Sequence, residues 1–288
     1  MTAIDPATAE FKRRVEAEWA IDETAAAWQK HYPRMKEQLA EVTGALIDAA
    51  RPTPGEKVLD LASGTGEPAI PLAKAVAPAG AVTAADLSAP MLAALRENAA
   101  AAGVTNIRTR VCDATELPFP DSTYDLVTSR FGVMFFSDVA CALAEVRRVL
   151  RPHGRLTFLA WGPPAPSTYF GASVMPYMRR LPEPPAPDGP GPMRFAEPAK
   201  LARLVEAAGF TGVREERPVL PAPYHGTPEE LLTSLMEIAA PLRNAVAGLS
   251  EADRRAADEE ALANLRASYD GEYVRVTAAV VIITASAV

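Results

Sequence analysis

Three carboxylates recur at the ends of consecutive apolar runs, and this spacing can build a binding site for a cationic ligand. Asp60 lies in VLDLA, Asp86 ends AVTAAD, and Asp113 follows RVC. If each run is a strand of one parallel sheet, the carboxyl ends meet at one edge and the three acids line a single site. A ligand that carries an ammonium and a sulfonium charge gains from such a site, whereas an anionic ligand does not.

A glycine-rich turn follows Asp60, and it fits two kinds of cofactor. Gly64, Gly66 and Ala69 match the pattern G-x-G-x-x-A, in which backbone N–H groups at a helix start bind the pyrophosphate of a dinucleotide. Pro68 removes one of these N–H groups where the helix is expected to begin, and Asp60 adds a negative charge nearby. We therefore favour a cofactor without a pyrophosphate, and an NAD(P)-dependent oxidoreductase remains an alternative.

The elements that must position these residues alternate between strand and helix. Five β-α units fall between VLDLA at residue 58 and LTFLAW at residue 156, and two further strands are expected at TGVREERPV and VTAAVVIITASA. The last run is too short and too rich in β-branched residues for a membrane-spanning helix, so we interpret it as a buried strand. The pattern predicts a doubly wound α/β fold.

Capping and breaking residues set the expected helix boundaries. Ser88 is the predicted N-cap of the helix that follows the second strand, and Gly103 is its predicted stop. Thr227 is a predicted N-cap with Pro228 in the first helical position. Pro33 is expected to interrupt the N-terminal helices.

Four segments are expected along the chain: an N-terminal helical cap (1–50), a core with the three acids (51–162), a proline-rich segment (163–198), and the remainder of the core sheet (199–288), with a helical insertion at about 227–268. The proline-rich segment cannot form a ladder strand. It is either a structureless linker or a lid or substrate-side insertion, and its aromatic and methionine residues favour the second interpretation.

Composition and charge exclude several classes of protein. The net charge of −7 is spread over stretches of mixed sign, so we expect no nucleic-acid partner. The two cysteines, Cys112 and Cys141, are too few for a disulfide framework or a four-cysteine zinc site; we interpret both as core residues and expect no metal. The small number of cysteines fits a reducing cytoplasm, and the N-terminus lacks a secretory apolar core, so we expect a cytoplasmic protein without membrane insertion. We expect a monomer or a homodimer.

Four separated motifs together resemble one enzyme family. DLASGTGEP, ADLSAPML, VCDATELPFPDSTYDLVTSRFGVMFF and AEVRRVLRPHGRL occur in order over roughly residues 55 to 162. The chain resembles the Rossmann-like, class I S-adenosylmethionine-dependent methyltransferases, and among them the group of ubiquinone/menaquinone-biosynthesis and small-molecule natural-product methyltransferases. The resemblance implies a seven-stranded, mainly parallel sheet with an antiparallel last strand, N-terminal helices and helical cap insertions.

The resemblance also implies a role for each residue of the cofactor site. Asp60 approaches the amino group of the methionine moiety, Asp86 accepts both ribose hydroxyls, and Asp113 accepts from the adenine amine. The residues that surround the cofactor are Ala62, Ser63, Gly64, Gly66, Leu87, Met91, Ala114, Ser129, Arg130 and Phe131. Many relatives have glycine at the place of Ala62, and the methyl group there leads us to expect φ below zero.

The implied reaction is methyl transfer from S-adenosylmethionine to a small, aromatic or lipophilic acceptor, with S-adenosylhomocysteine as the product. The in-line displacement requires that donor and acceptor are held close, aligned and dry, without a metal or a covalent intermediate. We expect oxygen as the acceptor atom first, then carbon, then nitrogen. Alternatives are an S-adenosylmethionine-binding enzyme of the same fold that does not methylate, and a non-catalytic binding subunit.

The acceptor side is defined less sharply, because no motif in the cap names a substrate. His31 and His225 are the candidate bases, and a surface or packing role is the competing interpretation of each. The residues expected to line an acceptor pocket are Trp28, Tyr32, Met134, Tyr169 and Tyr224. The same side chains can instead pack the cap onto the sheet.

Overall fold

An eight-stranded sheet forms the centre of the structure, a computed structural model that describes residues 10, 12–13, 17–19, 21–165, 167–183, 186 and 188–288. Its strands are β1 (Lys57–Leu61), β2 (Ala81–Asp86), β3 (Ile107–Val111), β4 (Tyr124–Arg130), β5 (Leu150–Trp161), β6 (Thr211–Glu216), β7 (Val219–Pro221) and β10 (Thr277–Ser286). The order is β3-β2-β1-β4-β5-β10-β6, with β7 paired to β10. Because β10 alone runs antiparallel to its neighbours β5 and β6, the predicted fold class is confirmed.

The number of strands differs from the predicted seven, because the segment expected as one strand over 211–219 is divided. β6 pairs with the end of β10 near Ile282, and β7 pairs with its start near Ala278. Pro218 separates the two strands and has no N–H to donate to the ladder, although its carbonyl accepts from the N–H of Val280 at 3.1 Å. The count is therefore eight.

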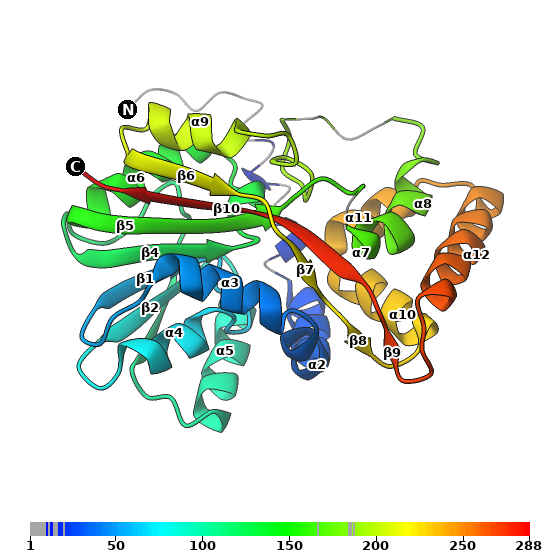
Figure 1. Ribbon diagram of the computed structural model, residues 1–288, viewed down its shortest axis with the longest axis horizontal. Coiled ribbons are helices and arrows are strands. Elements are labelled where there is room, and N and C mark those ends of the chain that lie inside the picture. Colours follow the sequence, from blue (N-terminus) through cyan, green and yellow to red (C-terminus); the bar gives the residue numbers. More distant parts are fainter. Residues whose placement is uncertain are drawn as a thin grey trace.

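Helices cover both faces of the sheet, which explains the near-continuous apolar strands. α3 (Ala40–Ala50), α4 (Ala69–Val76) and α5 (Ala89–Ala101) lie on one face, and α6 (Val139–Val149) and α9 (Lys200–Ala207) lie on the other (Figure 1). The core between these layers includes Leu59, Val127 and Phe158, none of which has any exposed surface. The predicted N-cap of α5 is confirmed, since the Ser88 hydroxyl accepts from the N–H of Met91.

Five helices form a lobe beyond the carboxyl ends of the parallel strands (Figure 1). This helical lobe consists of α7 (Thr168–Ser173), α8 (Met175–Met178), α10 (Pro228–Ile238), α11 (Ala240–Val246) and α12 (Glu251–Ala267). A two-stranded ribbon, β8 (Tyr224–His225) with β9 (Tyr273–Val274), lies at its base, and a single 3₁₀ turn, η1 (Val133–Phe135), follows β4. α10 begins as predicted, with Thr227 as its N-cap and Pro228 in its first turn.

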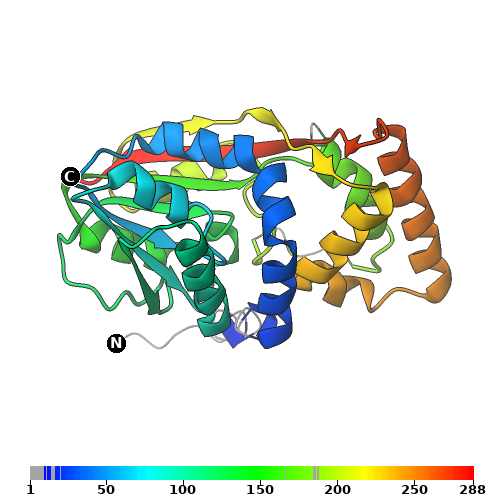
Figure 2. The same cartoon turned by 90° about the horizontal axis from the view of Figure 1, so that it is seen from below.

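The helix α2 (Asp22–Gln38) stands between the sheet and the helical lobe (Figure 2). The expected break at Pro33 is wrong, because α2 continues through this residue to Gln38. Proline removes one helical hydrogen bond, but side chains on either side of it anchor α2 to the lobe and the ribbon. Trp28 Nε1 donates to the carbonyl of Ile238 at 2.9 Å, and Arg34 Nη1 donates to the Tyr224 hydroxyl at 3.1 Å.

The two cysteines occupy different environments. Cys112 is half-buried against the core, and burial raises the pKa of its thiol to about 11. Cys141 is exposed, so the prediction that it lies in the core is wrong: it sits in the first turn of α6, where its N–H donates to Asp138 and its Sγ donates to the carbonyl of Thr115. Among the described residues, no helix is long and apolar enough to cross a bilayer, and no three His, Cys, Asp or Glu side chains group as metal ligands.

Candidate functional site

The three acids lie at the carboxyl ends of three neighbouring strands. Asp60 is in β1, Asp86 is the last residue of β2, and Asp113 follows β3 by two residues. β2 pairs with both β1 and β3 in parallel, so these ends meet at the edge of the sheet nearest α2 (Figure 1). The sheet therefore brings together the acids that the sequence places 26 and 27 residues apart.

Asp60 is a fully buried carboxylate with one oxygen unpaired. Its Oδ1 accepts from the Thr128 hydroxyl at 2.7 Å, whereas its Oδ2 has no hydrogen-bond partner among the described residues. Burial raises the pKa of Asp60 to about 7, and the Thr128 and Ser63 hydroxyls and the guanidinium of Arg130 oppose that rise. A buried carboxylate in this state gains from a cationic hydrogen-bond donor.

Arg130, at the end of β4, supplies the complementary unpaired donor. Its Nη1 donates to the Thr43 hydroxyl of α3 at 2.7 Å, and its buried Nε finds no partner in the described structure. Burial lowers the pKa of Arg130, while the charges of Glu67 and Asp60 act in the opposite direction. An acceptor at Asp60 and a donor at Arg130 match the ammonium and carboxylate of an α-amino acid, so the residues present fit the methionine end of S-adenosylmethionine.

Asp86 organises the glycine-rich loop. Its Oδ2 accepts from the N–H of Gly64 and its Oδ1 accepts from the N–H of Ser88, both at 2.9 Å. Burial raises the pKa of Asp86, and these backbone N–H groups counteract the rise. A carboxylate has about four lone-pair positions, so two remain for hydroxyl groups of a ligand. Leu87 is half-buried beside it, and Met91 is buried in the first turn of α5.

The loop itself needs left-handed backbone at three residues. Gly64 and Gly66 have φ of 51° and 122°, and Ala62 has φ of 54°, so the expected negative φ at Ala62 is wrong. Left-handed backbone costs a residue with a Cβ about 1–2 kcal/mol. The next residue is held firmly, because the Ser63 hydroxyl donates to the carbonyl of Asp60 at 2.7 Å and its N–H donates to the carbonyl of Ala85 at 3.1 Å.

Asp113 already has partners on both oxygens. Its Oδ1 accepts from the N–H of Thr115 at 2.9 Å, and its Oδ2 pairs with Lys12 Nζ at 2.8 Å. Burial raises the pKa of Asp113, but the ammonium of Lys12 and the N–H of Thr115 outweigh burial and lower it. Ala114, half-buried, follows directly. An adenine amine at Asp113 would share this carboxylate with Lys12.

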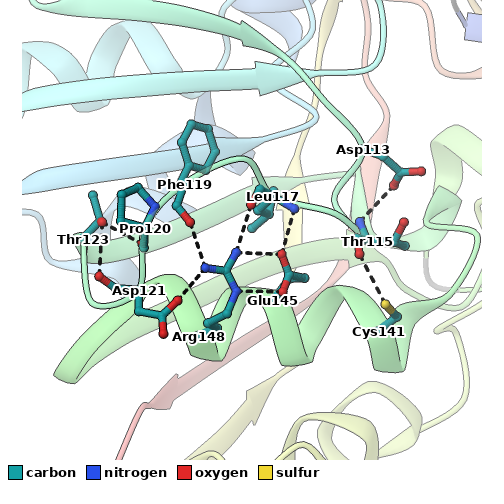
Figure 3. Close-up of polar contacts among 10 residues, drawn as sticks. All are labelled: Asp113, Thr115, Leu117, Phe119, Pro120, Asp121, Thr123, Cys141, Glu145 and Arg148. Atoms are coloured by element: carbon teal, nitrogen blue, oxygen red, sulfur yellow. Dashed lines mark hydrogen bonds and ion pairs between the residues drawn. The ribbon is translucent and has the colours of Figure 1, made fainter. Parts of the chain in front are cut away.

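The loop from Ala114 to Thr123 connects β3 to β4 without a helix and is held by polar contacts to α6 (Figure 3). Arg148 donates from Nη2 to the carbonyl of Leu117 at 2.9 Å and from Nη1 to the carbonyl of Phe119 at 2.8 Å. Glu145 accepts from the N–H of Leu117 at 2.8 Å and from Arg148 Nε at 2.8 Å. Arg148 also pairs with Asp121, so one guanidinium holds the middle of this loop at three residues.

Ser129 and Phe131 flank Arg130 at the end of β4. The Ser129 Oγ is buried without a partner in the described structure. Phe131 stacks on Trp161 with ring centroids 4.1 Å apart. Trp161 in turn contacts Tyr169 and Phe170 of α7, so this aromatic cluster joins the end of the sheet to the helical lobe.

The residues predicted for an acceptor pocket fall into separate groups. Trp28 lies with Trp19 and Phe135, next to the buried Met134. Tyr169 is buried in the aromatic cluster, and Tyr224 is buried with its hydroxyl on Arg34. The remaining member of the set, Tyr32, donates from its hydroxyl to Glu67 Oε1 at 3.1 Å and so contacts the glycine-rich loop directly.

Both candidate histidines are engaged at the boundary of the lobe. His31 Nε2 lies 2.6 Å from Glu237 Oε2 of α10, so it links α2 to the lobe. His225 is exposed in the ribbon, stacked on Tyr273, with Nε2 3.9 Å from Glu272. These contacts favour the packing interpretation over a catalytic one.

Sequence reasoning missed several residues of the site. Thr128 and Thr43 supply the hydroxyls that bind Asp60 and Arg130, and Glu67 receives the Tyr32 hydroxyl. The two threonines could not be identified from the sequence, because each lies in a different element from the residue that it binds, far away along the chain. Glu67 could have been identified from the sequence, because it directly follows Gly66 in the glycine-rich loop.

Comparisons with known proteins agree with this geometry. A family model described as a methyltransferase domain matches residues 58–154. A demethylmenaquinone methyltransferase from Thermus thermophilus is 43% identical over 135 residues, which are 47% of this chain and 60% of that protein. A ubiquinone/menaquinone biosynthesis C-methyltransferase from Cupriavidus metallidurans is 35% identical over 179 residues, which are 58% of this chain and 72% of that protein.

The chain belongs to the class I S-adenosylmethionine-dependent methyltransferases. It spans less than two thirds of the length of the Thermus relative. A putative methyltransferase from Bacillus halodurans has the same fold, with a TM-score of 0.55 and 20% identity over 85% of this chain and 97% of that one. Membership of this family removes the support for the dinucleotide interpretation of Gly64, Gly66 and Ala69.

In this methyltransferase, the match to the family model ends before the helical lobe begins. The family model stops at residue 154, whereas α7 starts at Thr168. Asp60, Asp86, Asp113 and Arg130 therefore lie within the residues that the family model matches, and the helical lobe lies outside them.

Proposed function

We propose that this chain transfers the methyl group of S-adenosylmethionine to a small hydroxylated aromatic acceptor and releases S-adenosylhomocysteine. The observation that carries the proposal is a pair of buried polar atoms at the carboxyl edge of a methyltransferase sheet. Among the described residues, neither the Oδ2 of Asp60 nor the Nε of Arg130 has a hydrogen-bond partner. They fit the ammonium and carboxylate that distinguish S-adenosylmethionine from a dinucleotide.

We assign to the surrounding residues the roles that the family resemblance implies. Asp60 holds the ammonium, and Ala62, Ser63, Gly64 and Gly66 cover the methionine moiety and the ribose. Asp86 accepts from the ribose hydroxyls. The residues around the adenine and beside the methionine moiety are Leu87, Met91, Asp113, Ala114, Ser129, Arg130 and Phe131. The cofactor supplies an electrophilic methyl group when it is bound, and these residues orient it while α2 and the lobe exclude water.

The acceptor is the finer part of the proposal. The relatives' names include C-methyltransferases of quinone biosynthesis, whereas the sequence alone favours oxygen, then carbon, then nitrogen. Loss of a phenolic proton makes both the oxygen and the ring carbons nucleophilic, so one hydroxylated aromatic class accommodates the first two acceptor atoms. The aromatic cluster of Phe131, Trp161 and Tyr169 supports an aromatic ligand at the lobe side. Acceptor and cofactor are small molecules, and the chain acts as a monomer or a homodimer.

The test is incubation of the protein with methyl-labelled S-adenosylmethionine and a panel of phenols, hydroquinones, naphthohydroquinones, fatty acids and amines. Label should pass to a hydroxylated aromatic compound, with one S-adenosylhomocysteine formed per product, and calorimetry should detect S-adenosylhomocysteine binding. Binding without transfer to any compound of the panel would support the non-methylating alternative, and transfer only to a fatty acid or an amine would overturn the aromatic acceptor. Failure of both cofactor forms to bind would overturn the proposal.

A further inference from the structure

A tyrosine and a glutamate join α2 to the cofactor loop, and no role in cofactor binding uses them. Tyr32 belongs to α2, which stands between the sheet and the lobe (Figure 2). Glu67 closes the glycine-rich loop, one residue after Gly66. The Tyr32 hydroxyl donates to Glu67 Oε1 at 3.1 Å, and both side chains are only half-buried. Each side chain of the pair therefore keeps some solvent-exposed surface.

The pair lies next to the groups that hold the methionine end. The guanidinium of Arg130 acts electrostatically on Tyr32, Glu67 and Asp60, so these four groups form one cluster. The Nζ of Lys36 lies 6.0 Å from the centroid of the Tyr32 ring. The sulfur that carries the methyl group belongs to the methionine moiety, so the acceptor atom must lie close to this cluster during transfer. Glu67 is therefore placed near the point at which the acceptor loses its proton.

We propose that Tyr32 and Glu67 form the proton relay that activates the acceptor hydroxyl, with Tyr32 touching the acceptor and Glu67 receiving the proton. This inference rests on the proposed methyl transfer and names the base that neither histidine supplies. Tyr32 donates its own proton to Glu67, which leaves a lone pair on its oxygen for the acceptor O–H.

The step balances in atoms and charge. The acceptor oxygen forms a bond to the methyl carbon as the carbon–sulfur bond breaks and leaves its electron pair on sulfur. The acceptor proton moves to the Tyr32 oxygen while the Tyr32 proton moves to Glu67, so the sulfonium charge is neutralised against the carboxylate. Glu67 then returns its proton to water. For a carbon acceptor, the ring proton restores the hydroxyl when the ring becomes aromatic again.

The environment of Tyr32 favours a relay over a tyrosinate base. Burial, followed by the negative charge and hydrogen bond of Glu67, raises the pKa of Tyr32 despite the opposing charge of Arg130. Tyr32 therefore keeps a proton at neutral pH and can only pass one on. A hydroxyl between acceptor and carboxylate fulfils that role.

A purely structural link between α2 and the loop is the competing explanation, and Glu67→Gln separates the two. The amide oxygen still accepts from the Tyr32 hydroxyl, so the link is kept and the basicity is lost. The relay predicts that kcat falls about 100-fold or more, in the range of general-base catalysis, while the affinity for S-adenosylhomocysteine stays within about twofold of wild type. Tyr32→Phe should show the same split. Glu37→Gln, an exposed acid on α2, and Tyr269→Phe are the matched controls and should retain wild-type rates.

The decisive readout is the acidity of the acceptor. The best phenol of the acceptor panel is compared with its ring-fluorinated analogues, whose hydroxyls lose their protons more easily. The relay predicts that the defect of Glu67→Gln shrinks as the phenol becomes more acidic and as the pH is raised. A defect that is equal for all analogues, or wild-type kcat in Glu67→Gln, overturns the relay while methyl transfer stands. Absence of transfer by the wild type overturns both proposals.

Discussion

One oxygen of Asp60 has no hydrogen-bond partner among the described residues, and the titration of this carboxyl group should report on the cofactor. Burial raises its pKa to about 7, so the folded protein holds a proton that the unfolded chain releases at lower pH. This group therefore contributes stability at acidic pH that is lost as the pH rises through about 7. A bound ammonium favours the ionised carboxylate, so the opposite trend is expected for affinity.

We predict that S-adenosylhomocysteine binds more tightly as the pH rises through about 7, with release of a proton on binding at lower pH. Calorimetry in buffers of different ionisation enthalpy measures that proton directly. Asp60→Asn should weaken binding and abolish the proton release. The same pH dependence in Asp60→Asn would assign the titration to another group.

Ala62 and Gly132 are far apart in the chain, but their backbones lie so close together that there is no room for a side chain at Gly132. A Cβ added to Gly132 would lie 2.4 Å from the Ala62 Cβ and 2.5 Å from the Ser129 Oγ. We predict that Gly132→Ala destabilises the protein by about 1–3 kcal/mol through overpacking, and that Ala62→Gly stabilises it by about 1 kcal/mol through relief of the left-handed backbone. Urea unfolding measures both.

The double variant supplies the control. Ala62→Gly removes the nearer contact, so it should recover part of the stability that Gly132→Ala loses, and the two changes should not be additive. Additive effects would mean that the side chain introduced at residue 132 does not contact residue 62 of the glycine-rich loop.

The sequence predicts the acids of the site but not their partners. Asp60, Asp86 and Asp113 follow apolar runs, and parallel strands necessarily align such positions. Thr128 reaches Asp60, Lys12 reaches Asp113 and Thr43 reaches Arg130 from other parts of the chain. Local patterns do not determine which side chains meet across the fold. The positive φ of Ala62 was likewise unpredictable, because residue type argued against it.

At the scale of elements, the loop after β3 takes the place of a packed helix and depends on α6. Arg148 and Glu145 bind its backbone at Leu117 and Phe119 (Figure 3). We predict that Arg148→Ala lowers stability by about 1–3 kcal/mol and weakens S-adenosylhomocysteine binding, because it leaves carbonyls and Glu145 without their charged partner. Differential scanning fluorimetry and calorimetry give the two values.

Arg147→Ala is the matched control, since Arg147 is exposed on the same helix. It should leave both values near wild type. Loss of stability in Arg148→Ala without any change in cofactor affinity would show that the loop does not position Asp113.

Helices and strands could be predicted where one hydrophobic pattern dominated the segment. The predictions that were wrong concern two prolines. Pro33 was expected to end a helix and Pro218 was not expected to divide a strand, yet the structure has the reverse. The outcome depends on anchoring. Contacts to the lobe and the ribbon hold α2 on both sides of Pro33, whereas the strands on the two sides of Pro218 pair with different parts of β10.

At the scale of the whole molecule, α2 is the connection between the sheet and the helical lobe. Glu237 of α10 binds both Lys30 and His31 of α2. We predict that Glu237→Gln loosens the lobe, so that the KM for the acceptor rises about two- to fivefold with little change in cofactor affinity, as expected for partly exposed ion pairs. Hydrogen exchange of α10 should also increase.

Glu229→Gln is the matched control, because Glu229 lies on the same helix but pairs with Arg266 inside the lobe. It should leave exchange at the α2 contact unchanged. Equal effects of the two variants would show that the connection does not run through Glu237. The sequence could predict that helices surround the sheet, but not that α2 and the lobe meet, because that contact joins residues more than two hundred positions apart.

The position of β10 has a consequence for how the protein is made. β10 lies between β5 and β6, and both of these strands precede it in the chain. While a ribosome is still adding the residues of β10, the facing edges of β5 and β6 have no partner, and their apolar side chains remain exposed to chaperones and to other nascent chains. The sheet that carries the cofactor site can close only after translation has passed Ser286.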